Sequence, residues 1–174
     1  MRVAHSIERF FFPARTCETA DWYHLVIRNM TDLAKMPFTP SEIAKRLGIS
    51  KLECEAAIDR LVCLKMIEPD PKNANRYRKV TDSSVVRSDI PNEALRRFHR
   101  QMLNKAIESL ETQTPKEKFI GSETFAFSEK QLPQAFEYAE EFLQKIALLG
   151  ERSESPTQVY HLGLQFFNLT KGTK

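Results

Sequence analysis

The stretch that decides the fold is SEIAKRLGISKLECEAAIDRLVCLKMI, residues 41–67. It predicts two helices joined by a tight turn. The first helix begins at Thr39-Pro40, because threonine caps a helix, proline suits the first helical position and Glu42 completes a capping box. Gly48 predicts the end of this helix, since glycine adopts the left-handed conformation that terminates helices.

A longer helix follows the turn. Ser50 and Glu53 repeat the capping-box pattern, and apolar residues recur at helical spacing as far as about Lys65. The apolar stripe that we expect to face inward consists of Cys54, Ala57, Ile58, Leu61 and Leu64. On the same helix, Cys63 is expected on the outer side.

The flanking segments complete a recognisable order of elements. Upstream, the residues from Glu18 onward predict a helix with an apolar stripe of Trp22, Leu25, Val26, Met30 and Leu33. Downstream, residues 66–67 and 76–81 predict two short strands around a turn-rich tip. Helix, short helix, turn, longer helix and hairpin in this order predict a winged helix-turn-helix domain, residues 17–81.

The remaining sequence predicts a second domain, residues 90–171. Pro91 opens a long linking helix, and FIGSETFAF (residues 119–127) and VYHLGLQFFNL (residues 159–169) have the alternation and aromatic content of strands. They flank a helix that begins near Ser128. A strand, a crossover helix and a strand form a right-handed parallel unit most simply.

The predicted fold class is therefore α+β, with an N-terminal winged helix-turn-helix followed by a linking helix and a β-α-β unit. Two strands make a poor sheet, so we expect these two to extend another sheet. That sheet is either the wing of the same chain or the matching strands of a second copy. We expect a homodimer built through the C-terminal half.

Composition excludes several classes of protein. The 174 residues are 41% hydrophobic and 28% charged with only five glycines, which is typical of a globular domain and excludes collagen-like, disordered and membrane-spanning chains. The apolar run at residues 10–12 is too short for a signal-peptide core. The three cysteines, Cys17, Cys54 and Cys63, show no metal or redox spacing, so we expect a reduced, cytoplasmic protein with no membrane partner.

The net charge of +3 hides a division along the chain. Residues 71–105 carry nine basic groups against three acidic ones, whereas residues 106–156 carry ten acidic groups against five basic ones. A protein divided in this way can attract a polyanion to its basic region. The alternative is that the charges coat solvated helices, with the wing arginines paired to the acidic half.

DNA binding is the leading hypothesis for function. In a helix-turn-helix the second helix of the motif enters the major groove, and the wing contacts flanking backbone. The groove-facing candidates are Lys51, Leu52, Ala56 and Arg60, and the candidates for phosphate contacts are Lys45, Arg46, Lys72, Arg76, Arg78 and Lys79. A DNA-binding regulatory protein, resembling a transcription regulator, is the predicted function.

Two carboxylates oppose this hypothesis. Glu55 and Asp59 fall on the outward side of the same helix, where the polyphosphate would lie. The second hypothesis is therefore a non-catalytic module whose winged helix binds another protein and has lost DNA binding.

Catalytic signatures are absent from the sequence. It contains no glycine-rich phosphate loop, no G-x-S-x-G elbow and no H-E-x-x-H, and its four histidines lie far apart without ligand spacing. We therefore predict no enzyme activity, no metal site and no cofactor. His24 and His99 are expected to be packed or hydrogen-bonded helix residues.

Several short motifs carry a resemblance to a known family. These are Trp22-Tyr23-His24, Ile27-Arg28, the run FHRQML at residues 98–103, and Val159-Tyr160 followed by Leu164-Gln165-Phe166-Phe167. In order and spacing they resemble an uncharacterised bacterial family with a winged-helix-like domain of unknown function, found as many paralogues in predatory deltaproteobacteria. The resemblance spans residues 17–171. It implies a cytoplasmic regulatory protein and transfers no catalytic or ligand-binding residue.

Overall fold

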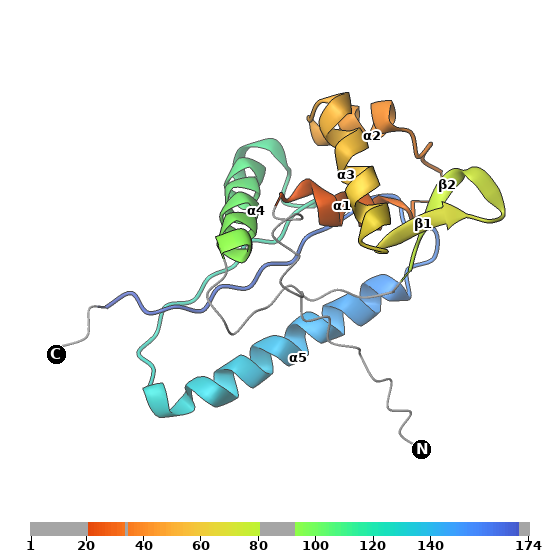
Figure 1. Ribbon diagram of the computed structural model, residues 1–174. Helices are drawn as coiled ribbons and strands as arrows, with labels where there is room; N and C mark the ends of the chain where they lie inside the picture. Colours follow the sequence, from red (N-terminus) through yellow and green to blue (C-terminus); the bar gives the residue numbers. More distant parts are fainter. Residues whose placement is uncertain (1–20, 34, 81–92, 171–174) are drawn as a thin grey trace, which may run out of the picture.

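The computed structural model describes residues 21–33, 35–80 and 93–170. Within these ranges the chain is α+β, with five α-helices and one antiparallel sheet of two strands. In Figure 1 the elements from α1 to β2 gather at one end of the molecule, α4 lies beside them and α5 runs beneath. The predicted boundaries at residues 17, 81, 90 and 171 lie outside the described residues, as does Pro91.

The order of elements from α1 to β2 matches the prediction from sequence. Their bounds are α1 Tyr23–Met30, α2 Pro40–Leu47, α3 Lys51–Cys63, β1 Ile67–Asp70 and β2 Asn73–Lys79. The C-terminal half contains α4 Glu93–Thr112, a short 3₁₀ helix η2 Glu129–Gln131, and α5 Leu132–Glu151.

Local signals fix the limits of α2 and α3 as predicted. The Thr39 hydroxyl accepts a hydrogen bond from the backbone N–H of Glu42, and Gly48 ends α2 at a φ of 67°. Ser50 and Glu53 form a complete capping box at the start of α3, with bonds of 2.8 and 3.1 Å. These caps satisfy backbone donors that no helical carbonyl can reach.

One hydrophobic core lies between α1, α2, α3 and β1. The side chains of Ile27, Ile43 and Leu61 are completely buried at its centre, and Ile67 closes it from the hairpin. Burial of one such side chain contributes about 1.5–3 kcal/mol. The predicted inward stripe of α3 is buried except for Leu64, which is half-buried at the end of the helix, and Cys63 is exposed.

The predicted stripe is buried only in part: Met30 and Leu33 are buried as predicted, but the rest of the buried face of α1 differs. His24, Ile27 and Arg28 are buried, whereas Trp22, Leu25 and Val26 are only half-buried. For His24 the hydrophobic pattern was misleading because a polar side chain can occupy a core when its hydrogen-bonding groups are satisfied, and both ring nitrogens of His24 have partners. His24 is both packed and hydrogen-bonded, as predicted.

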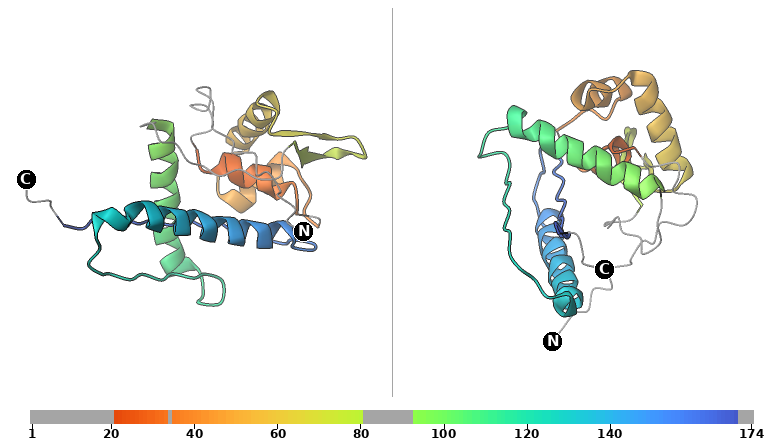
Figure 2. Two further views of the ribbon diagram at one scale, coloured as in Figure 1. Left: turned by 90° about the horizontal axis from the view of Figure 1, so that it is seen from below. Right: turned by 90° about the vertical axis from the view of Figure 1, so that its left-hand side faces the viewer.

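The hairpin is longer and its turn tighter than predicted. Glu68 pairs with Arg78 and Pro69 with Tyr77, and the register shifts at Asp70. The turn is only Pro71-Lys72, because the Asp70 carboxylate accepts the Lys72 backbone N–H at 2.9 Å and stabilises a compact tip. Figure 2 shows the hairpin projecting away from the helices.

The predicted β-α-β unit does not form in this chain. Helix α5 is present, but residues 119–127 and 159–169 are extended without being strands, and the sheet of the described residues contains only β1 and β2. Alternation and aromatic content favour a strand, but a strand exists only when a neighbouring backbone supplies its hydrogen bonds. Neither the hairpin nor the other extended segment does so.

Helix α4 is buried only along its first half. Ala94, Phe98 and Met102 are buried, whereas Ala106 and Leu110 in the second half of the helix are exposed. Every buried side chain of the described residues therefore lies between residues 24 and 102.

The C-terminus of α3 yields a prediction about stability. Lys65 ends the helix at a φ of 55°, with its N–H bonded to Val62 O and the Met66 N–H bonded to Leu61 O, both at 2.9 Å. This motif favours glycine, because a side chain is strained at that φ. We expect Lys65→Gly to raise the free energy of unfolding in urea by about 0.5–1 kcal/mol.

The matched control is Ala56→Gly at an exposed position inside α3, which should lower the free energy of unfolding by about 1 kcal/mol. A loss of stability in both variants would contradict this account of the helix end.

Candidate nucleic-acid interface

The turn between α2 and α3 presents the predicted contact residues to solvent. Lys45 and Arg46 are exposed on α2, and Lys51 and Leu52 are exposed at the first turn of α3, with Leu52 at 76% of its full exposure. Ala56 is exposed one turn further on. Backbone cap geometry therefore fixes a surface that combines cations with short apolar side chains.

Two of these cations form ion pairs within their own helix. Arg46 lies 3.4 Å from the Glu42 carboxylate, and Lys51 lies 3.5 Å from Glu55. Exposed pairs of this kind contribute at most about 1 kcal/mol, so a phosphate can replace the carboxylate. Among the described residues, no ion pair includes Lys45.

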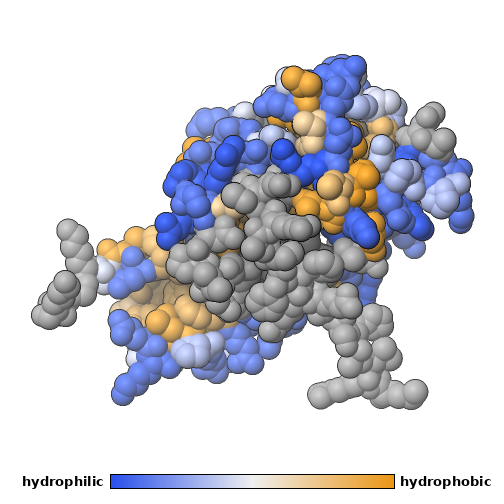
Figure 3. Space-filling view, viewed as in Figure 1, coloured by the Kyte–Doolittle hydropathy of each residue, from blue (hydrophilic) through white to orange (hydrophobic). Residues whose placement is uncertain are grey.

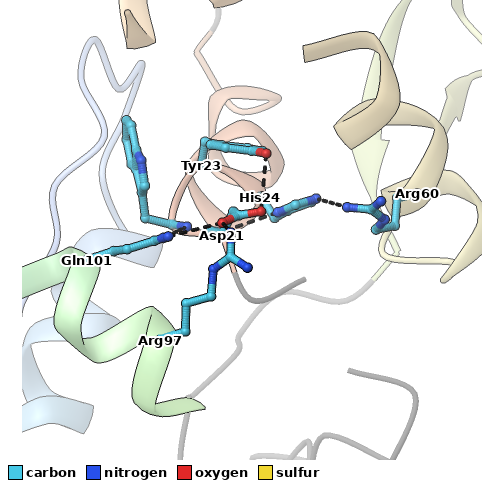
Figure 4. A network of polar contacts seen from close by, with 7 residues as sticks. Asp21, Tyr23, His24, Arg60, Arg97 and Gln101 are labelled. Atoms are coloured by element: carbon cyan, nitrogen blue, oxygen red, sulfur yellow. Dashed lines mark hydrogen bonds and ion pairs between the residues drawn. The ribbon is translucent and has the colours of Figure 1, made fainter. Parts of the chain in front are cut away.

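Arg60 is turned toward the protein interior. It is half-buried, and its Nη1 lies 3.2 Å from Nε2 of the buried His24, as Figure 4 shows. The Nδ1 of His24 lies 3.1 Å from the backbone oxygen of Asp21. Because a carbonyl oxygen only accepts, Nδ1 carries the proton and Nε2 accepts from Arg60. The guanidinium thus positions α3 against α1.

The cations of the hairpin are largely engaged within the chain. Arg78 pairs with Glu68, its cross-strand neighbour, and Lys79 pairs with Asp32 in the segment after α1. Arg76 donates to two backbone oxygens of that segment, at 2.9 Å to Leu33 and 3.5 Å to Thr31. Arg76 therefore anchors the hairpin to the helices.

Lys72 occupies the exposed tip of the hairpin. No ion pair in the described part of the chain includes its ammonium group. Of the ten predicted contact residues, Lys45 and Lys72 are thus the cations available without breaking an ion pair. Four others are held in ion pairs, and Arg60 and Arg76 are held by polar groups of the fold.

A polar junction, which we call the Asp21 junction, joins α4 to the start of α1. The Asp21 carboxylate pairs with Arg97 and accepts from Gln101 Nε2 at 3.0 Å, while the Trp22 backbone N–H donates to Gln101 Oε1 at 2.8 Å. The ammonium of Lys105 lies 4.7 Å from the centre of the Trp22 ring. Figure 4 shows the Asp21 junction continuing through His24 to Arg60.

The electrostatics of the Asp21 junction follow from these contacts. Burial raises the pKa of Asp21, but the hydrogen bond from Gln101 and the charge of Arg97 outweigh it, so the pKa lies below 3.8. Burial and the charge of Arg60 lower the pKa of His24 below 6.5, against the opposing effect of the Asp21 backbone oxygen and carboxylate. His24 is therefore neutral at pH 7, as its bond from Arg60 requires.

No sequence pattern identifies Asp21, Arg97 and Gln101 as one cluster. The contacts that Arg97 and Gln101 make with Asp21 join residues 76 and 80 positions apart, and no local pattern signals them. The sequence did contain one hint, since Arg97 and Gln101 are spaced to share a face of one helix.

Neither a metal cluster nor a membrane span is found in the residues that the structure describes. No group of three or more histidine, cysteine, aspartate or glutamate side chains there could hold a metal ion. No helix in these ranges has both the length and the apolar character needed to cross a membrane.

Comparison with known proteins identifies the family. Residues 14–169 match the family described as Domain of unknown function (DUF4423). The chain belongs to the DUF4423 family. This confirms the predicted membership of an uncharacterised family, and the match spans both the hairpin-bearing half and the C-terminal half of this DUF4423 chain. No curated protein and no solved structure matches it.

The buried His24 yields a prediction about pH. The pKa of His24 is 6.5 in the unfolded chain and lower in the folded chain. Between these two values the unfolded chain binds a proton at His24 that the folded chain does not. The free energy of unfolding therefore falls as the pH drops from 6.5 through the folded pKa. We expect His24→Gln to reduce the fall in unfolding free energy between about pH 7.5 and 5.5.

Part of the pH dependence should remain in the variant, because burial also lowers the pKa of His99. Urea unfolding at a series of pH values measures both slopes. An unchanged slope in His24→Gln would show that His24 is not the titrating group.

Proposed function

We propose that residues 21–80 of this DUF4423 chain form a winged helix-turn-helix that binds duplex DNA, and that the protein acts in the cytoplasm as a DNA-binding regulator. The observation that carries the proposal is the exposed turn between α2 and α3, with Lys45, Arg46, Lys51 and Leu52 around it, beside a projecting hairpin tipped by Lys72.

The order and contacts of the elements support this reading. Helix α3 packs against both α1 and α2, and the turn at Gly48 leaves the first turn of α3 uncovered. In helix-turn-helix proteins the corresponding turn of the second helix reaches base edges in the major groove. The hairpin follows α3 directly, as a wing does.

In this proposal the ten candidate residues have different roles. Lys45 and Lys72 bind phosphates directly, and four further cations, Arg46, Lys51, Arg78 and Lys79, do so by exchanging a surface carboxylate for a phosphate. Leu52 and Ala56 face the groove, where apolar groups contact thymine methyls. Arg60 and Arg76 are positioning residues that hold α3 and the hairpin in place.

This division implies binding with little sequence discrimination. Bases are read chiefly by arginine, lysine, asparagine and glutamine side chains in the groove, and once Arg60 is assigned to His24 only Lys51 of that kind remains among the groove-facing candidates. Phosphate contacts fix position and supply affinity without reading sequence.

A specific observation favours the second candidate, a protein-interaction module. Asp59 is exposed and Glu55 is half-buried on α3, and Leu52 beside them is an apolar side chain at 76% of its full exposure. A surface of this mixed character suits a protein partner better than a polyanion. This candidate predicts that the wild-type chain does not bind duplex DNA even at low salt.

Salt-dependent binding tests the proposal. We expect wild-type protein to raise the fluorescence anisotropy of a labelled random-sequence duplex, with a log–log salt slope of about −5 for six phosphate contacts. Lys45→Glu combined with Lys72→Glu removes two contacts and should reduce the slope by about 2, with at least a tenfold loss of affinity at low salt.

The matched control is Lys116→Glu combined with Lys130→Glu, which makes the same change in net charge at exposed sites in the C-terminal half. It should retain the wild-type slope. No salt-sensitive binding by wild type, or equal losses in the two double variants, would refute a DNA surface at the helix turn and hairpin.

A further inference from the structure

The C-terminal half of the chain lacks a core of its own. From residue 103 to residue 170 no side chain is buried, and α5 contributes none over its 20 residues. Nine aromatic side chains between Phe119 and Phe167 are exposed to between 41 and 94%. A helix rich in apolar residues is stable in water only when another surface covers its apolar face.

Contacts between aromatic rings show which side of α5 the partner would cover. Phe166 lies 6.2 Å from Phe125, 5.3 Å from Phe127 and 6.4 Å from Phe136, measured between ring centres. These contacts bring both extended segments to one side of α5. Figure 3 shows apolar side chains gathered where the first turns of α5 lie beside residues 159–170.

The backbones of the two extended segments also lack partners. Within the described residues, no hydrogen bond joins the backbone of 119–127 or 159–169 to another backbone group. Backbone N–H and C=O groups are almost always paired in a stable fold, and an unpaired extended segment is a template for another strand. A partner that supplies strands would satisfy both segments.

The low charge of the two extended segments indicates what kind of partner they bind. Glu123 is the only charged residue in the two extended segments. A surface with so little charge does not suit a polyanion or a strongly charged peptide, and it does not repel an identical surface. We therefore expect the partner to present apolar side chains and a backbone that can pair as a β-strand.

We propose that this partner is a second copy of the chain, and that residues 119–170 form the interface of a homodimer in which the extended segments of two copies pair as strands beside α5. The hairpin of the same chain does not pair with them, since its sheet stays two-stranded. In a twofold-symmetric dimer the same segments of both copies meet. One interface then pairs the unpaired backbones and covers the aromatic faces of both chains.

The available area suits a stable dimer. The nine exposed aromatic side chains alone offer roughly 1,000 Å² per copy, taking about 200 Å² for each complete side chain. Two copies then bury about 2,000 Å², which lies at the lower end of the range for obligate homodimers. The proposal does not depend on DNA binding, and its test uses protein alone.

Mass measurement on single-site variants tests the interface. Light scattering after gel filtration at micromolar concentration should give wild-type protein twice the chain mass of 20.2 kDa. Phe167→Glu replaces an aromatic side chain that is 70% exposed in the single chain with a carboxylate. It should leave the fold of residues 21–80 intact and weaken dimerisation at least tenfold.

The matched control is Leu52→Glu, which makes the same kind of change at a similarly exposed residue on α3 and should remain dimeric. Circular dichroism verifies that both variants are folded, and Phe119→Glu serves as a second interface variant should Phe167→Glu not fold. A wild-type mass of one chain or of more than two, a dimer unaffected by both interface variants, or dissociation of Leu52→Glu would overturn the proposal.

Discussion

The carboxylate of Asp21 holds together elements that are far apart in the sequence. It pairs with Arg97 and accepts a hydrogen bond from Gln101 on α4, while the Asp21 backbone oxygen fixes the tautomer of His24 and so the bond that His24 accepts from Arg60 on α3. The Asp21 junction thus links α4 to α1 and, through His24, to α3, beside the buried side chains of Ala94, Phe98 and Met102 on α4.

The affinity of the proposed DNA surface depends on which cations are paired with carboxylates as well as on how many cations there are. Arg78 and Lys79 lie next to carboxylates, so their attraction for a polyanion is partly cancelled before binding. The Arg78–Glu68 pair is solvent-exposed and weak, so a phosphate replaces its carboxylate at little cost, whereas the Lys79 side chain is only 12% exposed and exchanges its partner Asp32 less readily. Arg60 and Arg76 differ, since each is half-buried and bonded to polar groups of the fold. Releasing either residue would loosen the packing of α3 or of the hairpin.

The features that sequence could predict are those set by neighbours in the chain. Thr39, Gly48, Ser50 and Glu53 predict the ends of α2 and α3 because each cap acts within a few residues. The orientations of Arg60 and Arg76 depend on contacts 36 and 43 residues away, which no local pattern encodes. The segments 119–127 and 159–169 have the composition of strands, but forming a sheet depends on a neighbouring backbone, and none pairs with them among the described residues.

Hydrogen–deuterium exchange with and without saturating duplex DNA at low salt tests most directly where this chain binds. If the proposed DNA surface is correct, adding DNA slows amide exchange at the turn between α2 and α3 and at the tip of the β1–β2 hairpin, with no change in α5. Slower exchange confined to residues 119–170, or no change anywhere, would contradict it.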